Sequence, residues 1–559
     1  MAIDFNKIGL GGGKNYTFTS PDNTIDINEV DDEVQLQVNK QVAFTLPVSS
    51  DPAIDNAKYN DFGLLTDDVT ITYPASDPGE VKIFYGQFQT DLDNLYTVDF
   101  GNDVILTGDT EMHPYSIYLF QIVGNFVLLK EIRFGGLKNK VIGKVVNGFS
   151  GDHVVISVNG TNTNVSVGSD GWFFYDVAPS VTRVKFNTAD KTNFEKIYIA
   201  DLNSLTDMSY MFDGCSNLIS LDVSNLNTAN VTNMQMTFRY LTLTSLDVSN
   251  FNTANVTNMS NMFQYCSNLT SLDVSNFNTA NVNAFNAMFS GCSNLTSLDV
   301  SNFNTANSTN FYLMFSDCSK LTSLDVSNFN TAKATSMQDM FRNCSKLTSL
   351  DVSNFNTANV TNIESMFYNC SSLTSLDVSN FNTANVTTMF QTFYLMSNLL
   401  SLDVSNFDTA NVTTMRGMFQ SCNKLTNLDV SNFNTANVTT MLDMFSTCNS
   451  LTSLDVSNFN TANVTTMQRM FNSCSKLTSL DVSNFNTANV TNMQNMFAYC
   501  SILTDINMDN IILSNNVNVT DLLKNDANLQ TIYLRNSDTT TYDKINAVKP
   551  AGATIVTAA

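Results

Sequence analysis

Charged residues are few in this sequence, and those present are unbalanced. They make up 14% of the 559 residues, and 51 acidic side chains outnumber 27 lysines and arginines, which leaves a net charge of −24. Binding to DNA or RNA needs clustered Lys and Arg, so this charge argues against a nucleic-acid partner. It argues equally against attachment to an anionic membrane surface.

Long hydrophobic runs are also missing. Residues 1–7 hold no apolar signal-peptide segment, and the most apolar stretch, 117–129, is interrupted by Gln121, Gly124 and Asn125. Two strands around a Gly-Asn turn explain that stretch better than a membrane helix does. We therefore expect no membrane insertion and a chain that is made in the cytosol without a secretion signal.

Residues suited to catalysis are scarce. The only two histidines, His113 and His153, lie near no motif for nucleophilic catalysis. The glycine-rich segment 9–14 lacks the first glycine and the Ser/Thr of a phosphate-binding loop. We expect a protein that is not an enzyme.

What the sequence does contain is an internal repeat. The string Leu-Asp-Val-Ser-Asn recurs at a step of 25 residues once and of 26 thereafter. It begins at Leu221, Leu246, Leu272, Leu298, Leu324, Leu350, Leu376, Leu402, Leu428, Leu454 and Leu480. With degenerate copies on both sides, about 14 such units, here called rungs, cover roughly residues 194–540.

The rung at 269–294 shows the expected local structure. Leu272 and Val274 alternate with polar residues, which predicts a short strand with one buried face. Apolar residues from Val282 to Cys292 recur at helical spacing, which predicts a short helix. A single rung cannot bury its apolar side, so the rungs should stack. Their phenylalanines, for example Phe277, Phe303 and Phe329, should then form one buried row.

These motifs resemble a known family. Leu-x-x-Leu-x-Val is the strand of a leucine-rich repeat, and Asn-Val-Thr-Asn-Met-x-x-Met-Phe-x-x-Cys-Ser-x-Leu, as at 255–269, resembles the BspA-like leucine-rich-repeat surface proteins. The resemblance covers about 60% of the chain. It implies an α/β leucine-rich-repeat solenoid and a surface-displayed protein for adhesion or recognition, without catalytic residues.

Three domains are expected. Residues 1–140 carry strand-like segments separated by turn residues and should form an all-β docking domain. Residues 141–193 should form a small β-sandwich-like module with hairpin turns at Asn159-Gly160 and Asp170-Gly171. Residues 194–559 should form the solenoid, closed by a C-terminal cap with a last strand at Ile555-Val556.

All ten cysteines occupy one position of the repeat. They are Cys215, Cys266, Cys292, Cys318, Cys344, Cys370, Cys422, Cys448, Cys474 and Cys500. No Cys-x-x-Cys pair occurs, and Tyr240 and Met396 are taken to fill the same position in two rungs. This favours buried free thiols, and disulfides between adjacent rungs are the alternative.

Two sets of repeat positions are candidate binding residues. One is the aspartate after each strand leucine: Asp222, Asp247, Asp273, Asp299, Asp325, Asp351, Asp377, Asp403, Asp429, Asp455 and Asp481. This Asp ladder should point outward, and mutual repulsion should raise the pKa of some members. It is either a solvated face or, from Asp273 to Asp403, a site for sugar hydroxyls or weakly bound calcium, the one cofactor that the sequence suggests.

The other candidate set is the tyrosines at variable positions on the convex side. Exposed tyrosine is a frequent contact residue at interfaces. The set is Tyr265, Tyr312, Tyr368 and Tyr394, with Tyr499 in a later rung.

These features favour a phage virion appendage, a tail or head fibre that attaches to the host. Such proteins are made in the cytoplasm and end on the virion surface. The expected partners are a host cell-surface protein or glycan and, through the N-terminal region, other virion proteins; the oligomeric state stays open. A BspA-like adhesin on the bacterial cell surface is the alternative.

Overall fold

A computed structural model of the chain describes residues 139–168, 171–186, 188–200 and 202–557, together with the backbone of thirteen strands before residue 134. The chain divides into two compact units, which are described separately. The front unit comprises residues 1–141, 175–178 and 198–202, and the repeat unit comprises 142–174, 179–197 and 203–559. His113 lies outside the described residues.

The described residues of the front unit before residue 134 form strands. They are β1 (Tyr16–Thr19), β2 (Thr24–Ile27), β3 (Glu29–Val30), β4 (Glu33–Val34), β5 (Val42–Thr45), β6 (Tyr59–Leu65), β7 (Val69–Thr72), β8 (Val81–Thr90), β9 (Tyr96–Asp99), β10 (Ile105–Thr107), β11 (Glu111–Met112), β12 (Ser116–Val123) and β13 (Phe126–Arg133). The larger sheets have the orders β10-β13-β12-β8-β6 and β11-β9-β7-β5. Strands β12 and β13 pair antiparallel with Val123 opposite Phe126, which confirms the predicted hairpin.

Strands continue past residue 139. They are β14 (Lys140–Val145), β15 (His153–Val158), β16 (Thr161–Ser166), β17 (Trp172–Asp176), β18 (Val184–Lys185), β19 (Phe194–Ala200) and β20 (Ser220–Asn225), in sheets ordered β16-β15-β18 and β17-β14-β19-β20. Asn159 and Gly160 both have positive φ, 48° and 84°, between the antiparallel strands β15 and β16. This is the backbone of a type I′ turn and confirms the hairpin predicted there.

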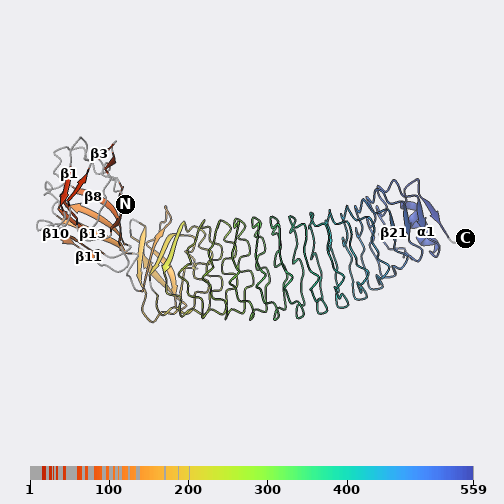
Figure 1. Cartoon of the computed structure of the whole chain (residues 1–559), viewed down its shortest axis with the longest axis horizontal. Coiled ribbons are helices and arrows are strands. Elements are labelled where there is room, and N and C mark those ends of the chain that lie inside the picture. The colour runs from red at the N-terminus through yellow and green to blue at the C-terminus, as the bar shows by residue number, and fades with distance from the viewer. Residues whose placement is uncertain are drawn as a thin grey trace. The chain divides into compact units, whose positions relative to one another are not determined.

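The repeats stack as a solenoid (Figure 1). A column of phenylalanine rings is buried inside it. One ring per rung, from Phe212 to Phe497, packs on the next at 5.5–5.9 Å with nearly parallel planes. Phe277, Phe303 and Phe329 are each 2% exposed and pack against this column, which confirms their predicted burial. At the N-terminal end, Phe186 continues the column at 5.3 Å from Phe212.

The short helix expected in each rung is absent from the described residues, and that prediction is wrong. Its place is taken by two successive turns, such as Met259–Met262 and Phe263–Cys266, each closed by a backbone hydrogen bond. The third residue of each turn has positive φ, 58° at Asn261 and 59° at Tyr265. Alternate amides in this segment donate to the next rung instead of to residue i−4, so an α-helix cannot form.

The strand expected at every Leu-Asp-Val is present only near the two ends, in β20 and in β21 (Ser479–Asp481). The nine segments between residues 246 and 456 are not strands, and that prediction is wrong for them. The parallel bridges that join successive rungs lie instead at the start of the turn segments, from Asp207 to Asn518. The backbone ladder therefore follows the turns, and the Leu-Asp-Val segments stay unpaired along most of the array.

The C-terminal end closes as expected. Strands β22 (Asp505–Asn507), β23 (Thr531–Tyr533) and β24 (Thr554–Val556) extend β21 as a parallel sheet. The last of them contains Ile555 and Val556, which confirms the predicted final strand. Helix α1 (Thr539–Val548) precedes β24 and is the only α-helix among the described residues. No described helix has the length and apolar character needed to cross a membrane.

The ten cysteines are buried and unpaired, which confirms the prediction of free thiols. From Cys266 to Cys500 each thiol donates to a phenylalanine carbonyl of the preceding rung at 3.0–3.2 Å. One assignment is wrong: Leu241, not Tyr240, takes the cysteine position, because this rung is one residue shorter after that point. Tyr240 is exposed instead.

Asparagine side chains tie the rungs together. Asn276 and its counterparts donate to a serine carbonyl of the preceding rung, as Asn302 does to Ser275 at 2.7 Å. A second row donates to an alanine carbonyl, as Asn281 does to Ala254 at 2.8 Å. These bonds explain why an array with little charge is rich in Asn.

Candidate recognition surfaces

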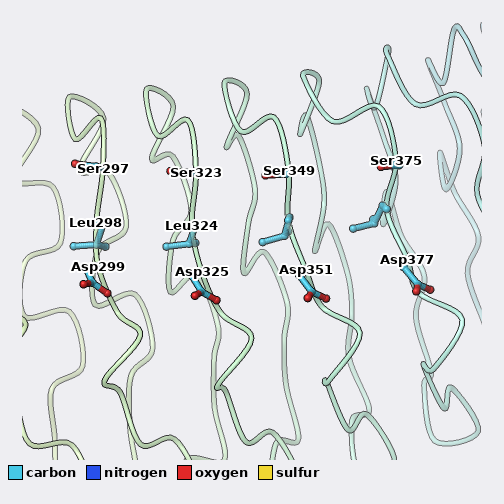
Figure 2. A pocket seen from close by; sticks show the side chains of 12 residues that line it. Ser297, Leu298, Asp299, Ser323, Leu324, Asp325, Ser349, Asp351, Ser375 and Asp377 are labelled. Atoms are coloured by element: carbon cyan, nitrogen blue, oxygen red, sulfur yellow. The ribbon is translucent and has the colours of Figure 1, made fainter.

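The Leu-Asp-Val side of the solenoid presents three parallel rows of side chains. Figure 2 shows serine, leucine and aspartate side by side in four successive rungs, beginning with Ser297, Leu298 and Asp299. Together these residues line a shallow depression of about 690 Å³. The leucines form its floor and are 6–7% exposed, whereas the aspartates are exposed to solvent.

Each exposed aspartate is held by the serine two residues later. Ser301 donates to Asp299 Oδ1 through its amide at 2.9 Å and through its hydroxyl at 2.7 Å. These bonds favour the charged carboxylate and lower the pKa of every ladder member from Asp247 to Asp455. The predicted rise is wrong for these residues, because local hydrogen bonding outweighs repulsion between rungs.

The Leu-Asp-Val side does not contain a preformed calcium site. A calcium ion takes several oxygen ligands that converge on one point. The Asp ladder supplies one carboxylate per rung, and the described residues contain no cluster of three or more potential metal ligands. The geometry therefore gives no support to a calcium site at the Asp ladder.

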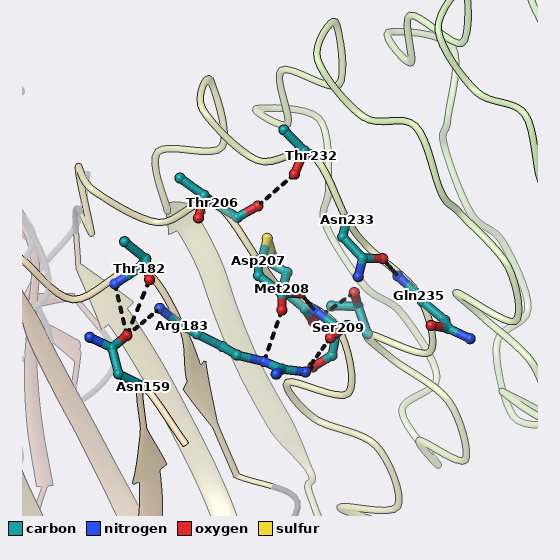
Figure 3. Close-up of polar contacts among 11 residues, drawn as sticks. Asn159, Thr182, Arg183, Thr206, Asp207, Met208, Ser209, Thr232, Asn233 and Gln235 are labelled. Atoms are coloured by element: carbon teal, nitrogen blue, oxygen red, sulfur yellow. Dashed lines mark hydrogen bonds and ion pairs between the residues drawn. The ribbon is translucent and has the colours of Figure 1, made fainter. Parts of the chain in front are cut away.

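The turn side of the solenoid is shaped by a local hydrogen-bond motif at the start of most turn segments. Figure 3 shows the first two rungs, where Ser209 donates its amide to Asp207 Oδ1 at 2.8 Å and Gln235 donates to Asn233 Oδ1 at 3.1 Å. Arg183, next to β18, forms an ion pair with Asp207 at 3.0 Å and holds the first of these turns. The motif aligns the variable positions of successive turns on one surface.

The predicted tyrosines lie on this turn side, and three of them, Tyr265, Tyr368 and Tyr394, stack with a tyrosine of an adjacent rung. Tyr240 and Tyr265 stack at 5.0 Å, and Tyr368 and Tyr394 stack at 4.6 Å. Tyr312 stands between the two pairs along the chain and is 36% exposed. We call six aromatic residues of this side between residues 240 and 394 the aromatic strip: Tyr240, Tyr265, Tyr312, Tyr368, Phe390 and Tyr394. Tyr499 lies on the same side in a later rung, outside the strip.

Two arginines that lie over rings of the strip escaped the sequence reasoning. The Arg342 guanidinium lies 4.1 Å from the centre of the Tyr368 ring and 3.2 Å from Asp339 Oδ1. The Arg416 guanidinium lies 5.5 Å from the Phe390 ring centre, and no described carboxylate pairs with it. Both arginines stand at repeat positions where other rungs carry an aromatic residue of the strip, and where the sequence departs from the common repeat. That departure could have revealed the arginines from the sequence.

The remaining candidate histidine has an ordinary environment. His153 is exposed, and its Nδ1 lies 2.6 Å from Oδ1 of the adjacent Asp152. This pair is local to the start of β15 and brings no nucleophile with it.

The repeat region is recognised by a model of a known protein family. The family described as "Mycoplasma protein of unknown function, DUF285" matches residues 182–272, 237–351, 266–375, 335–453 and 426–534, which together exceed half of the chain. The chain belongs to this family. The DUF285 matches overlap one another, as expected where one unit recurs along a solenoid.

Two solved structures are similar to part of this chain. A chain of the TLR13-ssRNA13 complex is 17% identical, with a TM-score of 0.21, over 63% of this chain and 49% of that one. The functional domain of InlJ from Listeria monocytogenes, described as including a cysteine ladder, is 20% identical, with a TM-score of 0.17, over 63% of this chain and 78% of that one. This chain thus spans about half the length of the TLR13 chain. No curated protein matches it.

Proposed function

We propose that this chain is a non-enzymatic recognition protein that binds a surface molecule through the turn side of its solenoid. The aromatic strip carries this proposal. Corresponding positions elsewhere in the array hold small or polar residues such as Ser290 and Ser446, whereas Tyr368 and Tyr394 stack there in two successive rungs. Tyr and Arg are the residues that most often dominate binding interfaces.

Two further observations support recognition over a purely structural role. The stacked Phe column and the Asn bonds connect every rung to its neighbours, so the strip lies on a continuously bonded support. Such a support keeps contact residues in place and lowers the entropy cost of binding. The sequence resemblance to BspA-like surface proteins points to the same function.

The proposal also covers the larger assembly to which this protein belongs. A phage virion appendage with a docking front unit is one setting, and its partners would be other virion proteins and a host-surface protein or glycan. The bacterial cell surface is the other setting. Immunogold electron microscopy with an antibody against the full chain separates them, because label falls on released particles in the first case and on producing cells in the second.

Binding of the fluorescent full chain to intact cells tests the recognition function itself. We expect saturable binding that a Tyr368→Ala/Tyr394→Ala variant weakens at least tenfold. A Tyr499→Ala variant is the control, since Tyr499 is a 43% exposed tyrosine in a later rung, outside the aromatic strip, whereas Tyr368 and Tyr394 are half-buried. Absence of saturable binding to the cells that carry or meet the protein would refute the proposal.

A further inference from the structure

The aromatic strip differs in charge from the rest of the molecule. Arg239 donates twice to Asp213, at 2.7 and 3.0 Å, and Arg342 pairs with Asp339, so most of the charge along the strip is internally neutralised. The whole chain carries a net charge of −24, and the Asp ladder faces solvent on its other side. The strip is therefore a nearly neutral surface on a strongly acidic protein.

This distribution selects among ligands by charge. A cationic ligand would be attracted first to the exposed carboxylates of the Asp ladder, and an anionic ligand would be repelled by the whole molecule. Only an uncharged ligand would gain more binding free energy at the strip than at any other part of the array. Specificity for the strip thus implies a neutral partner.

The chemistry of the strip narrows the class of neutral partner. The stacked tyrosines, with ring centres 4.6 and 5.0 Å apart, cover one face of each other and leave ring edges and phenolic hydroxyls, which are apolar and polar groups at the same place. Amide side chains occur in the turn segments of the same side, where Gln391 and Gln420 both border Gly417. Sugars have matching apolar C–H faces and hydroxyl groups, and in an extended chain successive units follow one another at a similar spacing.

We propose that the aromatic strip binds an uncharged glycan chain running along successive rungs. This inference rests on the proposed recognition function and specifies the ligand of the same surface. Arg416, which lies over Phe390 without a described carboxylate partner, is a free donor for sugar hydroxyls at one end of the strip.

An immobilised panel of uncharged hexose and N-acetylhexosamine oligosaccharides, with sialylated and sulfated counterparts, provides the test. The full chain should bind at least one uncharged member and prefer it to the acidic forms. Tyr368→Ala/Tyr394→Ala should weaken that binding at least tenfold, and Tyr499→Ala should change it less than twofold. Tyr368→Phe/Tyr394→Phe keeps the rings and should retain most of the affinity. Binding only to acidic members, binding to none, or equal losses in the test and control variants would overturn the inference.

A cell-binding experiment separates this inference from the proposed function. Enzymatic removal of surface glycans from the cells should abolish binding of the full chain. Binding that survives this treatment but is lost in Tyr368→Ala/Tyr394→Ala would identify a protein partner, which refutes the glycan inference and leaves the recognition function intact. Absence of cell binding before treatment would refute both.

Discussion

The last rung contains a buried carboxyl at the position where ten other rungs have a thiol. Asp526 lies 26 residues after Cys500, is 1% exposed, and accepts the Cys500 amide on Oδ1 at 2.7 Å. Its Oδ2 has no hydrogen-bond partner among the described residues. Burial raises the pKa of Asp526 from the ordinary 3.8 to about 7. The C-terminal end of the array should therefore respond to pH.

The sign of the effect follows from proton linkage. The folded state holds the Asp526 proton more tightly than the unfolded state, so the stabilisation is complete below pH 4 and is lost as pH rises through 7. A difference of about three pH units corresponds to roughly 4 kcal/mol at most, since each unit is worth about 1.4 kcal/mol. Asp526→Asn keeps an acceptor for the Cys500 amide but cannot ionise, so this dependence should disappear.

Thiol labelling localises the measurement to the end of the solenoid. Cys500 contacts Asp526, whereas Cys344 lies in a middle rung, so the ratio of their alkylation rates reports opening of the last rungs. We expect the ratio to rise from pH 5 to pH 8 by up to about 10²-fold, because about two of the three pH units of stabilisation are lost in this range. The ratio should stay flat in Asp526→Asn and rise normally in Asp299→Asn. The same rise in wild type and Asp526→Asn would refute the reasoning.

Four other outcomes follow from the structure. Thiol reagents should label almost none of the ten cysteines in the native protein and all of them after denaturation; rapid labelling of several in the folded state would contradict their burial. Millimolar calcium should change the melting temperature no more than sodium chloride of equal ionic strength, because the described residues hold no metal-ligand cluster; a specific increase would show a site that the geometry lacks. Phe341→Ala should cost about 3–5 kcal/mol in chemical denaturation, since it removes one fully buried ring from the Phe column; a cost below about 1 kcal/mol would mean that the column is not continuous. Gly291→Ala should destabilise by about 1 kcal/mol or more, because φ is +76° and a Cβ would lie 2.4 Å from the Tyr265 ring; an unchanged melting temperature would contradict that packing.

The sequence predicts the register and the buried residues of the array because both follow from a strict repeat. Phe277 and the cysteines recur at fixed positions, and any stacked arrangement must bury them. The sequence did not predict the path of the backbone within each rung. Met259, Met262, Phe263 and Cys266 have the spacing of a helical stripe, yet two consecutive turns present the same residues inward.

Residue types at the left-handed turn positions contained the distinguishing signal. Across the rungs these positions hold Gly214, Gly291 and Gly417 and many Asn and Asp residues, which tolerate positive φ and are poor helix formers. The lowered pKa values of the Asp ladder could likewise be read from Asp-Val-Ser, a local side-chain-to-backbone motif.

The aromatic strip could be predicted only in part, because its geometry depends on contacts between rungs. Variation among the rungs singled out the tyrosines, but whether Arg342 lies over Tyr368 depends on the register of one turn segment on the next. That register is set by backbone bonds between rungs, such as Asn343 N–H to the carbonyl of Tyr368 at 2.7 Å. In a helix, the side chains of Arg342 and Tyr368 would point in other directions. The arrangement of the binding surface therefore could not be predicted without the turn geometry. The binding surface is thus a product of the turn geometry as much as of the residues that it displays.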